Sequence, residues 1–157
     1  NSPEVSKDPG WLHPPAAPEH LSDPLSSKKP AAEVLPAETC LGQWPVQLRL
    51  VSPMAGFFDG ADLLLAADCS AFARGDFHAR YMKGKVTVIG CPKLDPVDYS
   101  EKLTEIFRLH NIRSVTLVRM EVPCCGGLER AVQKALAACG RPIPFESVTL
   151  SVRGEIL

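Results

Sequence analysis

Residues 62–69 read Asp-Leu-Leu-Leu-Ala-Ala-Asp-Cys, a continuous apolar run that ends at an acidic residue and a cysteine. A run of this kind is typical of a strand that is covered on both faces, as in a parallel sheet. Residues 86–91, Val-Thr-Val-Ile-Gly-Cys, repeat the pattern and also end at a cysteine. Because such runs alternate with helical periodicity along the chain, they indicate βα units and a mostly parallel sheet.

The fold predicted from this pattern is α/β and three-layered, with a mostly parallel five-stranded sheet and helices on both faces. Its strands are expected at residues 46–51, 62–67, 85–90, 113–120 and 147–152. One helix should start at Asp95, which precedes a proline suited to the first helical position, and end near Asn111. A second helix should span about residues 127–138, and a shorter one residues 76–82.

The chain has 157 residues, 45% of them hydrophobic, which is enough for one domain with a buried core. Eight of its 15 prolines lie in residues 1–44, which are therefore predicted to form an extended Pro-rich leader to the α/β domain at 45–157. The leader carries three basic and six acidic residues, and the domain carries fourteen basic and twelve acidic residues. Neither part therefore has the strongly basic character of a nucleic-acid binder. No apolar run is long enough for a membrane helix, and a soluble cytoplasmic protein is expected.

Six cysteines are the most informative residues of the chain: Cys40, Cys69, Cys91, Cys124, Cys125 and Cys139. In a chain with a core and no visible secretory signal, metal or redox chemistry explains them better than a disulfide framework. Cys69, Cys91 and the Cys124-Cys125 pair follow three predicted strands. Since the carboxyl ends of parallel strands share one edge of a sheet, these four thiols are expected to lie together. Cys139 ends a helix that runs to the opposite edge, and it is expected to be a small buried hydrophobe.

Four gathered thiols could hold an iron–sulfur cluster, bind a structural zinc or carry out thiol redox chemistry. Neither the paired spacing of zinc knuckles nor the C-x-x-C of disulfide oxidoreductases is present. Residues 124–127, Cys-Cys-Gly-Gly, favour a cluster, because glycines let the backbone approach it and a helix start offers N–H groups to thiolates. The predicted ligands of a 4Fe-4S or larger cluster are Cys69, Cys91, Cys124 and Cys125, with Cys40 and His78 as candidates for additional ligands.

Three further side chains near the predicted ligands have weaker claims to a role. Lys93 and Arg119 could offset the charge of a thiolate-rich site, although solvated surface positions explain them equally well. Met120 is expected in the core. No P-loop, G-x-G-x-x-G or G-x-S-x-G motif is present, so nucleotide binding and serine hydrolase chemistry have no motif to support them.

Seven segments of the sequence form a specific pattern that spans residues 43–157: Gln43-Trp44-Pro45-Val46-Gln47-Leu48, Ala66-Ala67-Asp68-Cys69, Lys83-Gly84-Lys85, Gly90-Cys91-Pro92-Lys93-Leu94-Asp95, Lys102-Leu103-Thr104-Glu105-Ile106, Met120-Glu121-Val122-Pro123-Cys124-Cys125-Gly126-Gly127 and Gly154-Glu155-Ile156-Leu157. On these segments the chain resembles the carboxyl-terminal domain of ferredoxin-like iron–sulfur proteins of anaerobic bacteria. The resemblance implies cluster binding rather than a particular reaction. In those proteins a ferredoxin segment with two cubane motifs typically precedes this domain, whereas here the Pro-rich leader stands in its place.

The function expected from the thiols is electron transfer or redox sensing with a protein partner. Two alternatives stay open at this point. One is a redox catalyst that acts on a small molecule at an open iron site of the cluster. The other is a zinc-stabilised interaction module without redox chemistry.

Overall fold

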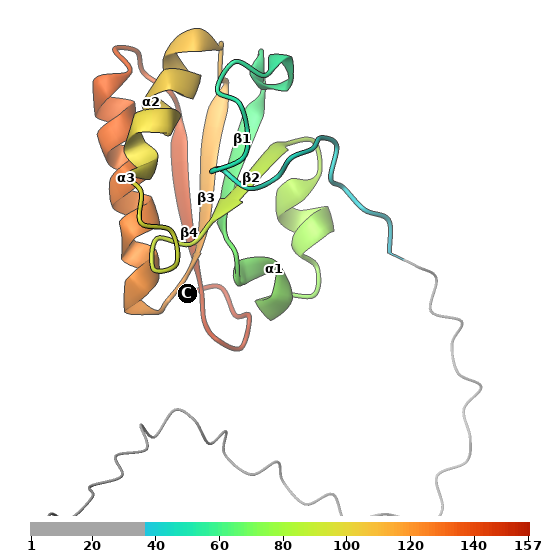
Figure 1. Cartoon of the computed structure of the whole chain (residues 1–157). Helices are drawn as coiled ribbons and strands as arrows, with labels where there is room; N and C mark the ends of the chain where they lie inside the picture. Colours follow the sequence, from blue (N-terminus) through green and yellow to red (C-terminus); the bar gives the residue numbers. More distant parts are fainter. Residues whose placement is uncertain (1–36) are drawn as a thin grey trace, which may run out of the picture. The chain divides into compact units, whose positions relative to one another are not determined.

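Four strands form one parallel sheet in the order β2-β1-β3-β4 (Figure 1). They are β1 (Asp62–Ala67), β2 (Val86–Gly90), β3 (Ser114–Met120) and β4 (Phe145–Leu150). The computed structural model describes residues 37–157, so most of the predicted leader lies outside the described residues. The described residues make up one unit, Ala37–Leu157, which begins eight positions before the predicted start of the domain.

Strand β1 lies at the centre of the sheet because its side chains are apolar on both faces. Leu63 pairs with Val86 of β2 on one side and with Val115 of β3 on the other. The side chains from Leu63 to Ala67 are all buried. The continuous apolar run therefore has the place that the sequence predicts for it.

Residues 46–51, predicted as a fifth strand, form a turn instead. They make a single isolated parallel bridge, between Gln47 and Ile89, and the two amides at positions 50 and 51 donate back to the Gln47 carbonyl. The Lys102 ammonium holds the turn by donating, at 2.9–3.0 Å, to the carbonyls of Leu48, Arg49 and Val51. The alternation of apolar and polar residues here belongs to a turn that buries Leu48 and Val51 and leaves Leu50 exposed, not to a strand.

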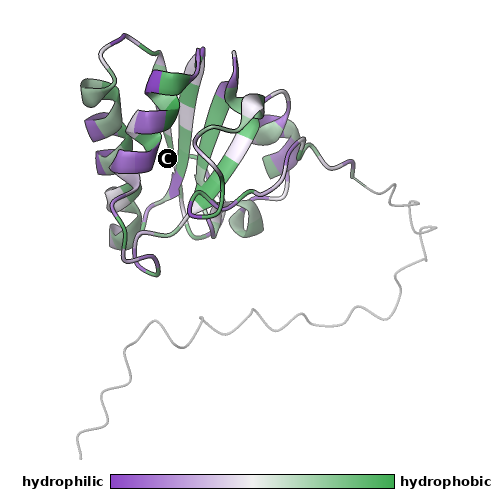
Figure 2. Cartoon of the chain, turned by 45° about the horizontal axis from the view of Figure 1, so that its top comes forward, coloured by the Kyte–Doolittle hydropathy of each residue, from purple (hydrophilic) through white to green (hydrophobic). Residues whose placement is uncertain are grey.

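Helices cover both faces of the sheet, as predicted. On one face α2 (Tyr99–Leu109) and α3 (Gly126–Ala138) lie side by side, and on the other lie α1 (Ser70–Ala73) and the short π-helical η2 (His78–Met82) (Figure 1). Figure 2 shows hydrophilic residues on the outer surfaces of α2 and α3 and hydrophobic residues along the strands. Among the described residues, no helix has the length and apolar character needed to cross a membrane.

Helix α2 begins at Tyr99 and not at Asp95. Its N-cap is Asp98, whose carboxylate accepts a hydrogen bond from the Ser100 N–H at 2.9 Å. Asp95 belongs to the preceding turn, where its own N–H donates to the Cys91 carbonyl at 2.9 Å. The proline at position 96 therefore precedes the helix, because the carboxylate nearer to Tyr99 provides the cap.

Candidate functional site

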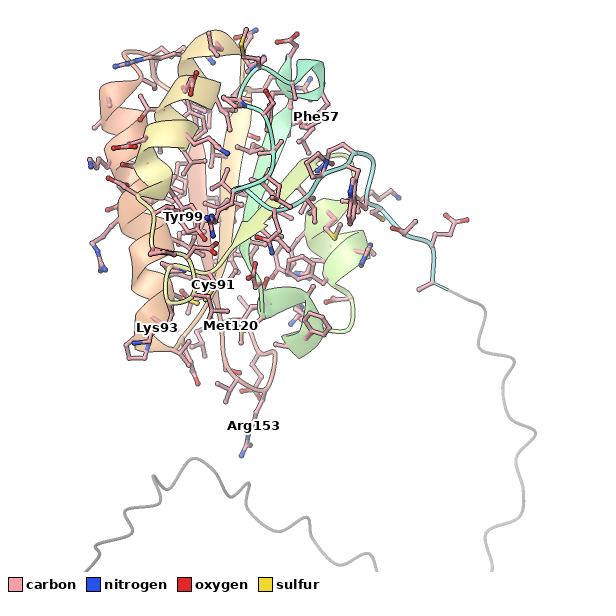
Figure 3. All side chains as sticks on the ribbon, in the orientation of Figure 1. Phe57, Cys91, Lys93, Tyr99, Met120 and Arg153 are labelled. Carbon is pink, nitrogen blue, oxygen red and sulfur yellow. The ribbon has the colours of Figure 1, made fainter. Side chains whose placement is uncertain are left out.

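The four predicted ligands lie in three loops at the carboxyl ends of neighbouring strands. Cys69 lies between β1 and α1, and Cys91 directly follows β2. Cys124 and Cys125 lie in η3 (Pro123–Cys125), a single 3₁₀ turn between β3 and α3. Figure 3 shows Cys91 at this end of the molecule and Phe57 at the other. We call these three loops, with their four cysteines, the thiol edge.

The thiol edge coincides with the point where the chain changes direction across the sheet. From β1 the chain passes to β2 on one side, and it then crosses back to β3 on the other side of β1. In open parallel sheets, ligands bind outside the carboxyl ends of the two strands where the connections diverge. Those strands are β1 and β3, which Cys69 and the Cys124-Cys125 pair follow.

The four thiols of the thiol edge differ in exposure. Cys125 is 6% exposed, Cys69 and Cys124 are exposed, and Cys91 is half-buried. Burial raises the pKa of the Cys125 thiol, and the nearby Cys124 and Cys69 thiols raise this pKa further, against a hydrogen bond with the Met120 backbone that lowers it. Strands β1 and β3 pair directly, with Ala66 beside Val118, so the loop of Cys69 and the loop of Cys124 and Cys125 leave neighbouring strand ends.

The Cys91 loop packs directly against the loop that carries Cys124 and Cys125. Gly127 lies in the first turn of α3, and a Cβ atom on this residue would lie 2.9 Å from the Pro92 Cβ. Only a residue without a side chain allows this approach. The contact holds the Cys91 loop against the loop that carries Cys124 and Cys125.

Two charged side chains near the thiol edge, Arg119 and Asp68, have polar partners. The Arg119 Nε lies 3.0 Å from the Glu129 Oε2, so this guanidinium is partly neutralised by a carboxylate. Asp68, next to Cys69, accepts a hydrogen bond from the Gln47 Nε2 at 3.3 Å, and burial raises its pKa. Lys93 is exposed, and Met120 is buried as predicted.

Sequence reasoning missed a polar contact beneath Cys91. The Tyr99 hydroxyl accepts a hydrogen bond from the Cys91 N–H at 2.9 Å and donates to the Asp95 carboxylate. The helical periodicity of the sequence places Tyr99 on the apolar face of the helix predicted to start at Asp95, and it gives no sign of this contact. The signal available in the sequence was the order Cys91, Asp95, Tyr99: an acidic residue four positions after the cysteine and a tyrosine four positions further on, at the start of the helix.

Cys40 and His78, the candidates for additional ligands, lie together but not at the thiol edge. The Cys40 N–H donates to the His78 Nδ1 at 3.0 Å. Cys40 also lines a cleft with Asp62, Lys85 and Arg113, which stand at the amino ends of their strands. The structure places this pair apart from the four predicted ligands, because the segment before β1 packs along η2 and the edge of β2.

Cys139 is buried at the end of α3, as predicted. It is 8% exposed, and its Sγ lies 3.2 Å from the Leu136 carbonyl and 3.3 Å from the Arg141 carbonyl. The α3 helix starts beside the thiol edge and runs away from it. Cys139 is therefore a packing residue that takes no part in the candidate site.

The donor chemistry of the thiol edge suits an iron–sulfur cluster. Thiolates are its usual protein ligands, and the first turn of α3 adds a glycine-bearing backbone and a positive helix end. Within residues 37–157, no three His, Cys, Asp or Glu side chains are close enough to hold a single metal ion. An iron–sulfur cluster would be held differently from a single ion, with each thiolate on a different iron atom.

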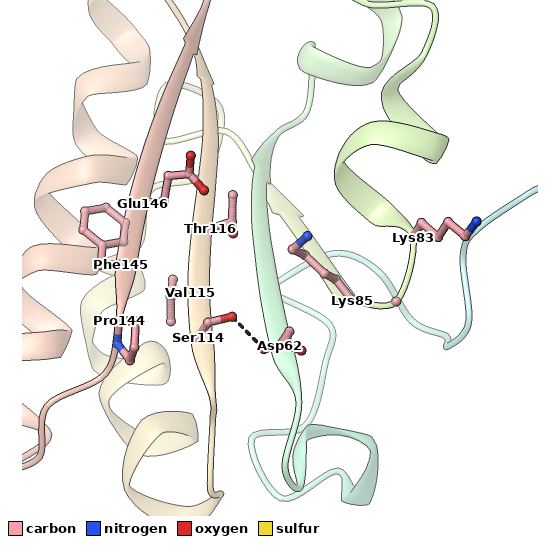
Figure 4. A pocket seen from close by; sticks show the side chains of 10 residues that line it. Asp62, Lys83, Lys85, Ser114, Val115, Thr116, Pro144, Phe145 and Glu146 are labelled. Carbon is pink, nitrogen blue, oxygen red and sulfur yellow. Dashed lines mark hydrogen bonds between the residues drawn. The ribbon is translucent and has the colours of Figure 1, made fainter.

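A cleft of about 580 Å³ lies at the opposite edge of the sheet (Figure 4). Lys83, Lys85 and Glu146 line it, together with Asp62, which accepts a hydrogen bond from the Ser114 Oγ at 2.7 Å. This bond and the Arg113 guanidinium lower the pKa of Asp62. None of the cysteines lines this cleft, so it is separate from the candidate site.

Comparison with known proteins agrees with the observed topology. Residues 55–157 match the family model described as a Rossmann-like domain. An uncharacterised protein of Archaeoglobus fulgidus is 35% identical over 115 residues, which cover 73% of this chain and 81% of the archaeal protein. No solved structure matches the chain.

Proposed function

The chain belongs to the Rossmann-like domain family, and we propose that it binds an iron–sulfur cluster at the thiol edge of its sheet. The ligands are Cys69, Cys91, Cys124 and Cys125. The observation that carries the proposal is the position of these thiols, which follow three adjacent parallel strands. Cys69 and the Cys124-Cys125 pair flank the divergence point between β1 and β3. Residues far apart in sequence thereby reach the place where this architecture binds ligands.

The first loop of the domain supports a thiol ligand over a dinucleotide. A dinucleotide site uses a glycine-rich turn after the first strand, followed by a helix whose N-terminus faces the phosphates. Here residues 68–70 read Asp-Cys-Ser, and α1 has only four residues. The loop offers a thiol where a phosphate-binding loop offers glycine backbone.

The exposure of the thiols favours electron transfer or redox sensing with a protein partner. Cys69 and Cys124 are exposed, whereas Cys125 is buried. One side of a cluster held by these residues therefore faces solvent, where a partner can contact it and exchange an electron. The buried thiol holds the other side within the protein, where hydrogen bonds and low solvent exposure set the reduction potential.

The same exposure supports a second candidate, a catalyst with an iron that a small molecule can reach. Adding cyanide or carbon monoxide to the reduced protein separates the two roles. A changed electron paramagnetic resonance spectrum supports an open iron site, and an unchanged spectrum supports electron transfer alone.

The direct test is metal and sulfide analysis of the full chain, purified or reconstituted without oxygen. We expect brown protein that contains iron and acid-labile sulfide. Serine at each of the four ligand positions should remove or convert the cluster, while the control Cys139→Ser should keep it. A colourless protein with one zinc per chain after reconstitution would refute the proposal and favour a zinc-stabilised interaction module.

A further inference from the structure

The backbone of Cys91 is held at both its N–H and its carbonyl group. The Cys91 N–H donates to the Tyr99 hydroxyl at 2.9 Å. The Cys91 carbonyl accepts from the Leu94 N–H at 3.2 Å and from the Asp95 N–H at 2.9 Å. These bonds close a tight turn that joins the end of β2 to the start of α2, so the direction in which the Cys91 side chain leaves the backbone is fixed.

The Tyr99 ring is positioned as firmly as its hydroxyl. The side chain is 4% exposed, and a Cβ atom on Gly90 would lie 2.8 Å from both the Cζ and the hydroxyl oxygen of Tyr99. The ring therefore lies directly against the last residue of β2. Its hydroxyl donates to the Asp95 carboxylate, and this bond leaves the oxygen lone pairs directed to the Cys91 amide.

We propose that Tyr99 is a positioning residue that keeps the Cys91 amide away from the sulfur atoms of the cluster. This inference rests on the proposed iron–sulfur function. Peptide N–H groups that donate to cluster or ligand sulfurs stabilise the more negative, reduced state and so raise the reduction potential. Because the Tyr99 hydroxyl accepts the hydrogen bond of the Cys91 N–H, this N–H does not donate to a cluster sulfur. The reduction potential of the cluster is therefore lower than it would be with a free Cys91 amide.

The test is the substitution Tyr99→Phe in the full chain, which keeps the ring and removes the hydroxyl. We expect a cluster with wild-type iron and sulfide content and a midpoint potential shifted to a more positive value. Tyr81→Phe is the matched control. Tyr81 is also buried, at 6% exposure, and its hydroxyl has no hydrogen-bond partner among the described residues, so this variant should keep the wild-type potential.

Asp95→Asn provides a second variant if Tyr99→Phe does not assemble a cluster. It keeps the tyrosine but replaces the charged acceptor of its hydroxyl proton with a neutral amide. The hydroxyl oxygen then becomes a weaker acceptor for the Cys91 N–H, and a smaller shift to more positive potential is expected.

The outcomes separate the two proposals. Wild-type protein without iron and sulfide refutes the cluster itself. A wild-type cluster whose potential is unchanged in both Tyr99→Phe and Asp95→Asn overturns the role of Tyr99 and leaves the cluster proposal standing. An equal shift in Tyr81→Phe also overturns it, because the effect is then not specific to the Cys91 amide.

Discussion

Alanine at Gly127 should separate the Cys91 loop from the loop that carries Cys124 and Cys125. The added Cβ would lie 2.9 Å from the Pro92 Cβ and 3.2 Å from its Cγ. Carbon atoms pack best at about 3.5–4.0 Å, so relief of the closer contact requires the two loops to move apart by roughly 0.6–1.1 Å. Overpacking of this kind typically costs about 1–3 kcal/mol.

Gly126→Ala is the matched control for this substitution. A Cβ on Gly126 would meet only the Arg130 Nη1, at 3.3 Å, and this atom ends a flexible side chain that can move away. Both residues lie at the start of α3, so the gain in helix propensity, up to about 1 kcal/mol, is common to the two variants. The difference between the variants therefore measures the clash with Pro92, and we expect Gly127→Ala to be less stable by about 1–3 kcal/mol.

The assay is denaturant unfolding of both variants, together with iron and sulfide content after anaerobic reconstitution. We expect Gly127→Ala to lose cluster occupancy as well as stability, because its loops no longer present the thiols together. Gly126→Ala should match the wild type or exceed its stability. Equal free energies of unfolding and equal iron content for the two variants would show that the loop contact has no influence on the site.

Three further predictions concern other parts of the chain. The variant Cys139→Ser should keep the wild-type iron content, and its free energy of unfolding should fall by less than about 1 kcal/mol, because the carbonyls of Leu136 and Arg141 can accept a hydrogen bond from the new hydroxyl. An iron assay and a denaturant unfolding curve check this prediction. Lys134 and Ser100 hold the pKa of Asp98 at about 2. Stability from the ionised carboxylate should be complete above its unfolded pKa of ~3.9 and fall as the pH drops toward 2, so acid unfolding curves of wild type and Asp98→Asn should converge there. Cys40→Ala should leave iron content and spectrum unchanged, and cluster loss in a folded variant would contradict the position of Cys40 beside His78.

The sequence was sufficient to predict the strands that place the thiols. The apolar runs of β1 and β2 are covered on both faces, so their composition alone identifies them as strands of a parallel sheet. Once the strands are parallel, the residues that follow them share one edge, whatever their separation along the chain. The thiol edge therefore follows from local patterns and a general rule of topology.

Contacts between distant segments decided what sequence reasoning missed. The turn at residues 46–51 depends on the Lys102 ammonium, 51 to 54 positions later in the chain. The partnership of Cys40 with His78 spans 38 positions. Local periodicity carries no information on such contacts. It also misplaced the start of α2, where Asp95 and Asp98 are both suitable N-cap residues. Asp98 caps the helix, while the Asp95 carboxylate accepts a hydrogen bond from the Tyr99 hydroxyl.

The distribution of the ligands over three βα units has a consequence for how the protein matures. The connections from β1 to β2 and from β2 to β3 both lie between Cys69 and Cys125 in the sequence. At a rate of synthesis of ~5–20 residues per second, the two cysteines leave the ribosome roughly 3–11 seconds apart. No short segment of the nascent chain contains the set, and Cys124 and Cys125 reach Cys69 only after β3 has paired with β1. A cofactor at this edge would thus be inserted into a folded apoprotein, which makes the delivery of iron and sulfide a step after synthesis rather than during it.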